Sequence, residues 1–299
     1  MIYVKKGIQI CFTLSLLLTI LALTACSNST TEDSSPATTV STVTTSQQNA
    51  STTSLLLPDE TTTSSSIPPG VILDEFGEII FMPIVDKDVP LLMYHTSSEE
   101  NPGKLDELYV KPSEFDKQIA WLIENGYTLC TFDDWYNLSI IDKPIFITFD
   151  DGYPENYTEI FPILKKYQAK ITLFLVANTI VLSKEEIREM SDSEFVKFES
   201  HTLTHPSLVG ISSNTDSLER ELRESKDVIE ALTGKNVLAL AYPNGEFNDK
   251  VKQISEKYYD FALRKDLGMH NTKYDNYEIR RIRINRSTSL ESFIHLITK

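Results

Sequence analysis

The chain has 299 residues, of which 41% are hydrophobic and 24% charged, and its formal net charge is −15. A hydrophobic share of this size can build a core, and the length of the globular part suits one domain. The acidic balance argues against a nucleic-acid partner, because neutralising phosphates requires clustered lysine and arginine. It fits a neutral or cationic polymer, and it equally fits solubility alone.

The first 25 residues have the pattern of an export signal. Lys5 and Lys6 precede an apolar stretch that runs from Ile8 to Leu23. This stretch is barely long enough to span a membrane and has no charged stop after it. The run Leu-Thr-Ala that ends at Cys26 resembles a bacterial lipobox, which implies cleavage before Cys26 and a lipid on its sulfur. We therefore expect a lipoprotein anchored to the extracellular face of a bacterial cell membrane.

A tether and one catalytic domain are expected after the signal. Residues 26–69 are rich in serine and threonine and poor in large apolar residues, so they cannot offset their chain entropy by burial. We interpret them as a flexible tether to a folded domain over 70–299. Cys130 would be the only other thiol of the mature protein, and its alternating surroundings predict a buried, inert side chain.

Strand and helix signals alternate through the domain. In chain order they predict a hairpin over 71–81, strands over 89–94, 145–149, 171–176, 195–198 and 237–241, and helices over 113–126, up to 167, over 185–190 and over 216–234. Ser113 is expected to cap the first helix, with Ile123 on its apolar face, and Asp216 with Glu219 to begin the longest one. Repeated buried strands separated by helices imply a parallel sheet, and about seven such units favour a closed or nearly closed α/β barrel.

Two adjacent carboxylates follow the apolar strand 145–149. Asp150 and Asp151 stand at its carboxyl end, where α/β barrels place their active sites, and Gly152 allows a sharp turn. Taken alone, such a pair is more often an ordinary turn that caps the next helix.

His201 and His205 supply two imidazoles just past another strand. Four residues separate them, so they share a face on a helical turn and can also converge on a tight loop. With one carboxylate they make three ligands for a zinc-like cation and leave a position open for water or substrate, which a catalytic metal needs. Carboxylate and imidazole suit Zn²⁺, with Co²⁺, Ni²⁺, Fe²⁺ or Mn²⁺ as alternatives. The second carboxylate is left to take a proton from that water.

His95 also ends a strand-like run. If it faces the metal it could donate a proton to a leaving group, and otherwise it simply closes the strand.

The order and wording of these motifs resemble the polysaccharide deacetylases, carbohydrate esterase family four, which share the NodB-like domain. The resemblance covers residues 89 to about 285 and rests on Thr-Phe-Asp-Asp-Gly152 and on Ser-His-Thr-Leu-Thr-His-Pro206. It implies a distorted (β/α)7-type barrel that removes N- or O-acetyl groups from sugars.

The resemblance also implies roles for individual residues. Asp150 would be the general base, and Asp151, His201 and His205 would hold the metal. The sequence departs from the family at Ala239, which stands where the usual third motif has an arginine that orients the base.

The segment Ala241-Tyr-Pro-Asn-Gly-Glu246 instead resembles the Tyr-Pro-x-Gly form of the poly-N-acetylglucosamine deacetylase branch. It suggests Tyr242 and the backbone of Asn244 as groups that meet the substrate or oxyanion. That branch places its acid histidine in an early Tyr-His, which His95 matches. Arg281 resembles a later motif that supports the active site, with an exposed strand charge as the alternative.

These observations favour a metal-dependent N-deacetylase of N-acetylglucosamine residues in a cell-surface polymer of the poly-N-acetylglucosamine type. Within the enzyme class, peptidoglycan N-acetylglucosamine deacetylation and O-acetyl glycan esterase activity are the alternatives. A non-catalytic glycan-binding lipoprotein is the alternative from another class, and the intact Asp-Asp and His-His pairs argue against it.

Overall fold

The computed structural model describes residues 72–73, 79–81, 86–101, 103 and 105–299. The expected signal peptide over 1–25, the tether over 26–69 and the lipidated Cys26 lie outside these ranges and stay predictions. In the part of the chain that is described, no helix is both long and apolar enough to cross a membrane.

A parallel eight-stranded sheet forms the centre of the domain. Seven of its strands follow one another in the order β12-β11-β10-β9-β8-β4-β14, and β7 pairs with the first half of β8. The strands are β4 (Leu91–Tyr94), β7 (Thr128–Cys130), β8 (Pro144–Phe149), β9 (Ile171–Leu175), β10 (Val196–Ser200), β11 (Ala239–Ala241), β12 (Phe261–Leu263) and β14 (Ile282–Arg283). One parallel bridge between Leu263 and Ile279 links β12 to the segment before β14. The sheet therefore curls back on itself, which confirms the distorted barrel.

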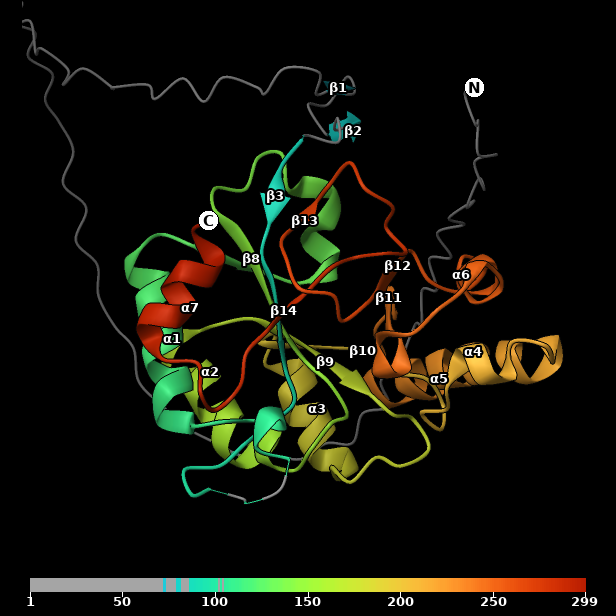
Figure 1. The fold of residues 1–299 in the computed structure, drawn as a ribbon, viewed down its shortest axis with the longest axis horizontal. Coiled ribbons are helices and arrows are strands. Elements are labelled where there is room, and N and C mark those ends of the chain that lie inside the picture. Colours follow the sequence, from blue (N-terminus) through green and yellow to red (C-terminus); the bar gives the residue numbers. More distant parts are fainter. Residues whose placement is uncertain (1–71, 74–78, 82–85, 102, 104) are drawn as a thin grey trace, which may run out of the picture. The chain divides into compact units, whose positions relative to one another are not determined.

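Helices cover the outside of this sheet (Figure 1). They are α1 (Pro112–Glu124), α2 (Phe161–Tyr167), α3 (Lys184–Asp192), α4 (Leu208–Ile211), α5 (Thr215–Thr233), α6 (Asp249–Ser255) and α7 (Leu290–Ile297). Short antiparallel ladders join β1 (Ile72–Leu73) to β2 (Ile79–Phe81), as the predicted hairpin requires, and β3 (Asp88–Val89) to β13 (His270–Asn271). A parallel ladder joins β5 (Thr96–Ser97) to β6 (Tyr109–Val110).

Two predicted helix starts were wrong by a few residues. Helix α1 begins at Pro112 after Lys111, because a proline is favourable in the first turn, so Ser113 is not its cap. The side chain of Asn214 caps α5 by accepting from the backbone N–H of Ser217, and Asp216 lies inside the first turn. Ile123, expected on the apolar face of α1, is 41% exposed.

The strands bury side chains on both faces. Ile145, Ile147 and Phe149 of β8 pack in the layer between sheet and helices, whereas Phe146 belongs to a second apolar cluster inside the barrel. Successive side chains of a strand point to opposite faces, so residues two apart share a face. The inner cluster fills one end of the barrel, and polar side chains take the inward positions toward the strands' carboxyl ends.

Candidate active site

The functional side chains lie just past the carboxyl ends of the strands, on the side that faces the inside of the barrel. Asp150 is two residues past Thr148 on β8, and His201 is two residues past Glu199 on β10. His95 directly follows β4, the neighbour of β8. The carboxyl ends of adjacent parallel strands meet at one edge, so residues as far apart in sequence as Met93 and Arg283 line a single pocket of about 340 Å³.

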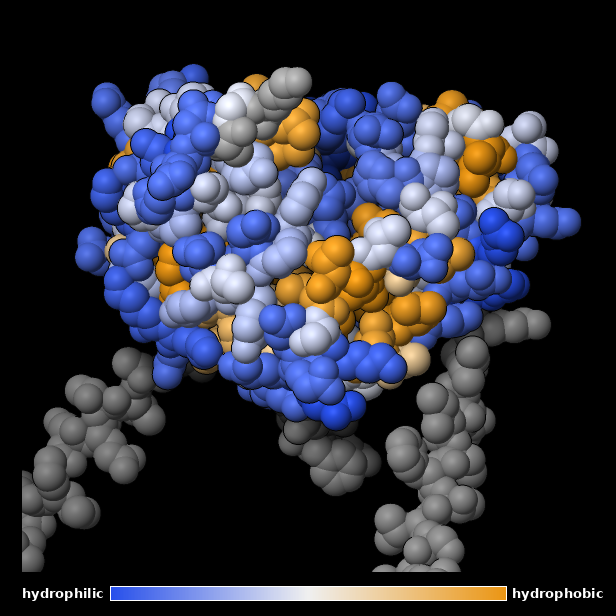
Figure 2. Space-filling model, turned by 90° about the horizontal axis from the view of Figure 1, so that it is seen from below, coloured by the Kyte–Doolittle hydropathy of each residue, from blue (hydrophilic) through white to orange (hydrophobic). Residues whose placement is uncertain are grey.

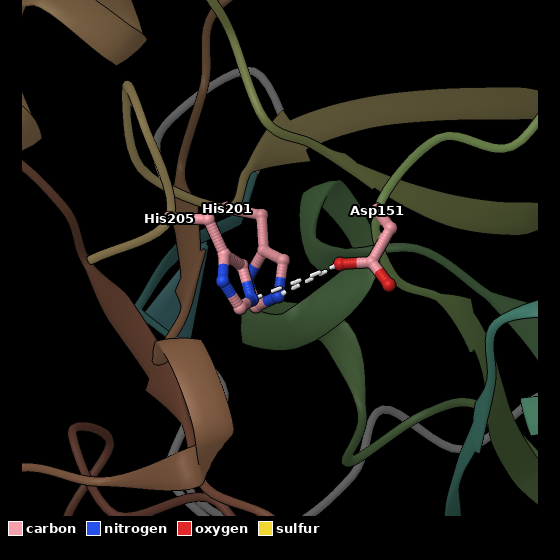
Figure 3. A group of neighbouring side chains, drawn as sticks. All are labelled: Asp151, His201 and His205. Atoms are coloured by element: carbon pink, nitrogen blue, oxygen red, sulfur yellow. Dashed lines mark ion pairs between the residues drawn. The ribbon is translucent and has the colours of Figure 1, made fainter. Parts of the chain in front are cut away.

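Asp151, His201 and His205 form one cluster. The Nε2 atoms of the two imidazoles lie 3.5 and 3.8 Å from Oδ1 of Asp151, and all three potential ligand atoms lie within 4.8 Å of one another. Figure 3 shows both rings turned toward the carboxylate from the opposite side of the site. The set fits a divalent transition metal, because these ligand types suit zinc and three protein ligands leave a position open.

A backbone carbonyl orients His201. Its Nδ1 lies 2.8 Å from the carbonyl oxygen of Ala241, and the residue is 3% exposed. A carbonyl can only accept, so Nδ1 carries the proton and the lone pair of Nε2 faces Asp151. The short strand β11 thereby fixes the tautomer of the residue that directly follows β10.

A loop, rather than a helix, brings His205 to the site. Its backbone N–H donates to Oγ1 of Thr202, and the N–H and hydroxyl of Thr204 donate to the two carboxylate oxygens of Glu221. Glu221 is 4% exposed on α5. This second support was missed from the sequence, although a glutamate within the apolar face between Leu218 and Leu222 was a signal for it.

The backbone is strained at these residues. Asp151, Thr202 and His205 have φ angles of 74°, 70° and 57°, in the left-handed region that side chains other than glycine rarely adopt. The branched Cβ of Thr202 makes that conformation especially costly, on the order of 1–2 kcal/mol. The surrounding contacts must therefore hold this strain, a situation that is common at functional sites.

Arg281 holds Asp150 in place. Its Nη1 and Nη2 donate to Oδ1 and Oδ2 at 2.6 and 2.8 Å, and Nη1 also donates to the hydroxyl of Thr148. Arg281 and Asp150 are only 1% and 3% exposed. Burial raises the pKa of the Asp150 carboxyl, but Arg281 and His201 outweigh this effect and bring that pKa below its usual range.

The exposed-charge alternative for Arg281 was therefore wrong. Arg281 directly precedes β14, far from Ala239 of β11 in the sequence, and supplies a guanidinium that Ala239 cannot. The replacement could not be found by looking near Ala239 in the sequence.

His95 lines the same pocket but has few contacts. Its Nδ1 is buried without a hydrogen-bond partner among the described residues. Burial lowers the pKa of His95 to about 4, against the opposing charge of Asp150. The imidazole is thus mainly neutral at pH 7.

Tyr242 and Asn244 differ from each other. Tyr242 is among the residues that line the pocket, while its ring stacks on Phe247, its hydroxyl donates to the carbonyl of Tyr277, and the residue is buried. Asn244 is exposed on the pocket wall with a φ of 58°.

A second, wider hollow of about 520 Å³ adjoins the pocket. It shares Asp151 and His205 with the pocket, and Tyr153, Val176 and Val181 are among its lining residues. Val181 is 64% exposed. The face in Figure 2 carries a broad area of apolar side chains bordered by charged ones.

Comparison with known proteins identifies the family. The family model for polysaccharide deacetylases matches residues 139–259. The Bacillus subtilis protein YxkH, whose name also refers to polysaccharide deacetylases, is 31% identical over 215 residues, which are 69% of this chain and 74% of YxkH. This chain belongs to the polysaccharide deacetylase family. Polysaccharide deacetylation is the activity that this membership supports.

Further relatives of this deacetylase agree with the assignment. A Staphylococcus epidermidis poly-beta-1,6-N-acetyl-D-glucosamine N-deacetylase is 31% identical over 58% of this chain and 67% of its own length. A polysaccharide deacetylase from Bacillus cereus matches the structure with a TM-score of 0.67 and 35% identity, over 76% of this chain and 75% of the other. The Streptococcus pyogenes deacetylase PplD has the same TM-score with 28% identity, over 72% and 100% of the two chains.

Proposed function

We propose that this deacetylase uses a divalent metal, most simply Zn²⁺, to remove N-acetyl groups from N-acetylglucosamine residues of a cell-surface polysaccharide of the poly-N-acetylglucosamine type. The observation that carries the proposal is the convergence of Asp151, His201 and His205 beside the buried pair of Asp150 and Arg281. A glycan-binding module would need neither a strained three-ligand cluster nor a buried carboxylate held ready by an arginine.

Asp151, His201 and His205 would hold the cation. When bound there, a divalent metal supplies Lewis acidity, which polarises a carbonyl oxygen and makes water more acidic. The Ala241 carbonyl keeps the Nε2 lone pair of His201 directed at the site, and Glu221 keeps the loop of His205 in place.

Asp150 acts as the general base. Arg281 keeps its carboxylate ionised and fixes its plane, while each oxygen retains a lone pair that can accept a proton from the attacking water. His95, on the neighbouring strand β4, donates the proton that the departing amine requires. Since burial lowers the pKa of His95 and leaves it mainly neutral, it first has to receive this proton, and the source is the proton that Asp150 removes from the attacking water. The backbone N–H of Asn244 is the proposed donor to the developing oxyanion.

Two features support a polymeric substrate. The pocket and the wider hollow share Asp151 and His205, so their combined space extends well past the reacting group. The staphylococcal relatives are named for activity on poly-beta-1,6-N-acetyl-D-glucosamine. A lipid at Cys26 and an extracellular position at the cell membrane would place the site beside such a polymer.

The test is acetate release from N-acetylglucosamine oligomers before and after chelation, with zinc added back. We expect activity to disappear with the chelator and return with zinc. Asp151→Asn and His201→Ala should lose bound metal, measured as zinc content, whereas Asp150→Asn should keep the metal and lose turnover.

His295→Ala is the matched control, because His295 is exposed on α7. Full turnover by Asp150→Asn would contradict its role as the base. A protein that releases acetate equally well without any metal would contradict the metal site.

A further inference from the structure

Arg283 lies one inward position beyond Arg281. Both belong to the segment that forms β14, and residues two apart on a strand share a face. Arg281 is buried against Asp150, whereas Arg283 is exposed at the strand's carboxyl end and lines the pocket that contains the metal cluster. Its register partner on β4 is Met93, which lines the same pocket. Arg283 is therefore the cationic side chain nearest the mouth on this strand.

Lys265 reaches the same pocket from the neighbouring wall. It stands two residues past Leu263, the last residue of β12, and the bridge from Leu263 to Ile279 joins that strand to the β14 segment. Gly245 packs closely on it, because a Cβ at Gly245 would lie 2.6 Å from both the backbone nitrogen and the Cβ of Lys265. With a φ of 68°, Gly245 lets the 243–245 turn hold the base of Lys265 at the pocket wall.

Neither cation has a counterion of its own. Among the residues that the structure describes, no hydrogen bond or ion pair engages the side chain of Lys265 or Arg283. By contrast, Arg264 forms ion pairs with Asp266 and Glu278, and Arg281 forms an ion pair with the carboxylate of Asp150. Among the described residues that line the pocket, the one other acid is Asp151, which belongs to the metal cluster. Both cations line the reaction pocket of a chain whose net charge is −15, and among the described residues neither has a paired acid.

We infer that the β12–β14 wall of this pocket binds an anionic group, a carboxylate or a phosphate, carried by the glycan next to the sugar that loses its acetyl group. The inference rests on the N-deacetylase activity of the proposed function, and it differs from that proposal in placing an acidic group on the N-acetylated glycan beside the reacting sugar. An arginine and a lysine suit this role, since a guanidinium forms paired hydrogen bonds with carboxylate or phosphate and an ammonium adds a point charge. The wider hollow, lined from β8, β9 and β10, lies on the other wall and would take the remaining sugars.

Matched substrate pairs isolate the charge. The first pair is a hexasaccharide of alternating N-acetylglucosamine and glucuronic acid and its methyl ester, and the second is an N-acetylglucosamine oligomer with and without a 6-phosphate. We expect kcat/KM for acetate release to favour the charged member of at least one pair roughly tenfold, the value of one hydrogen bond to a charged group. The pair that shows the preference tells carboxylate from phosphate, and added salt should weaken it.

Variants then assign the preference to the two side chains. Arg283→Gln and Lys265→Gln should each reduce the ratio of charged to uncharged kcat/KM severalfold. Arg220→Gln on α5 and Lys184→Gln on α3 remove comparable exposed charges away from the pocket and should leave that ratio unchanged.

Two results would overturn the inference. One is a wild-type ratio within twofold for both pairs, and the other is an unchanged ratio in both pocket variants. If no substrate releases acetate even with zinc, the proposed function fails separately, and the ratio of calorimetric affinities for the same pairs decides the anion site in its place.

Discussion

The buried pair of Arg281 and Asp150 allows a quantitative stability prediction. Arg281→Met keeps most of the side-chain volume but removes the charge, so the Asp150 carboxylate is left in an environment where it is only 3% exposed. Four hydrogen bonds are lost, at 2.6 and 2.8 Å to Asp150, 3.1 Å to Thr148 and 3.2 Å to the Arg264 carbonyl. Removing one partner of a buried ion pair costs about 3–5 kcal/mol, and full burial means that solvent screening does not reduce this cost.

The double variant Arg281→Met/Asp150→Asn separates the two parts of this cost. The double variant leaves no unpaired buried charge, so we expect it to be more stable than Arg281→Met alone. Its free energy of unfolding should fall by only about 1–2 kcal/mol relative to wild type. The free energy of unfolding is measured by urea titration with a chelator present, so that metal binding does not contribute.

Arg220→Met serves as the control, because Arg220 is exposed and should cost almost nothing. The reasoning is refuted if Arg281→Met costs less than about 1 kcal/mol, or if the double variant is no more stable than the single one.

Three further predictions concern residues outside the catalytic pair. Gly152 has a φ of 76°, and a Cβ added there would lie 2.5 Å from the Leu175 side chain, whereas Gly126 has a positive φ with no atom within 4 Å of its added Cβ. Gly152→Ala should therefore destabilise the fold by about 1–2 kcal/mol more than Gly126→Ala. Equal urea midpoints for the two variants would contradict the steric argument. Burial lowers the pKa of His270 from 6.5 to about 4, so the unfolded chain binds more protons in that window and stability falls as the pH drops through it. His270→Phe should remove up to about 2 kcal/mol of the stability difference between pH 7 and pH 5, and an unchanged difference in urea unfolding would refute this. Burial raises the pKa of the Cys130 thiol to about 12, so this thiol should react with a thiol reagent only when the protein unfolds. The test uses a protein in which Cys11 and Cys26 are replaced by serine. Rapid labelling of the native protein would disprove the prediction.

The sequence by itself predicted the parallel sheet and the reacting groups, and it favoured a closed or nearly closed barrel. Short apolar runs such as 145–149 and 171–176 predict strands buried on both faces, and their alternation with helices indicates a parallel sheet. The polar residues that directly follow those runs, Asp150 with Asp151 and then His201, had to come together, because parallel strands end at one edge. The loop to His205 is short enough that its position followed from that of His201.

Only the tertiary structure decided which distant groups complete the site. Arg281 pairs with Asp150 across 131 positions, and Glu221 on α5 fixes the loop that carries His205. Neither contact has a local sequence signal strong enough to choose it, because the closure of the sheet and the docking of α5 set both distances. The tertiary structure likewise set the hydrogen bond of the Tyr242 hydroxyl to the Tyr277 carbonyl, and it left Arg283 and Lys265 without a paired acid among the described residues. A pattern of period two tells which face a strand residue takes, but which strand lies opposite is decided by how the barrel closes.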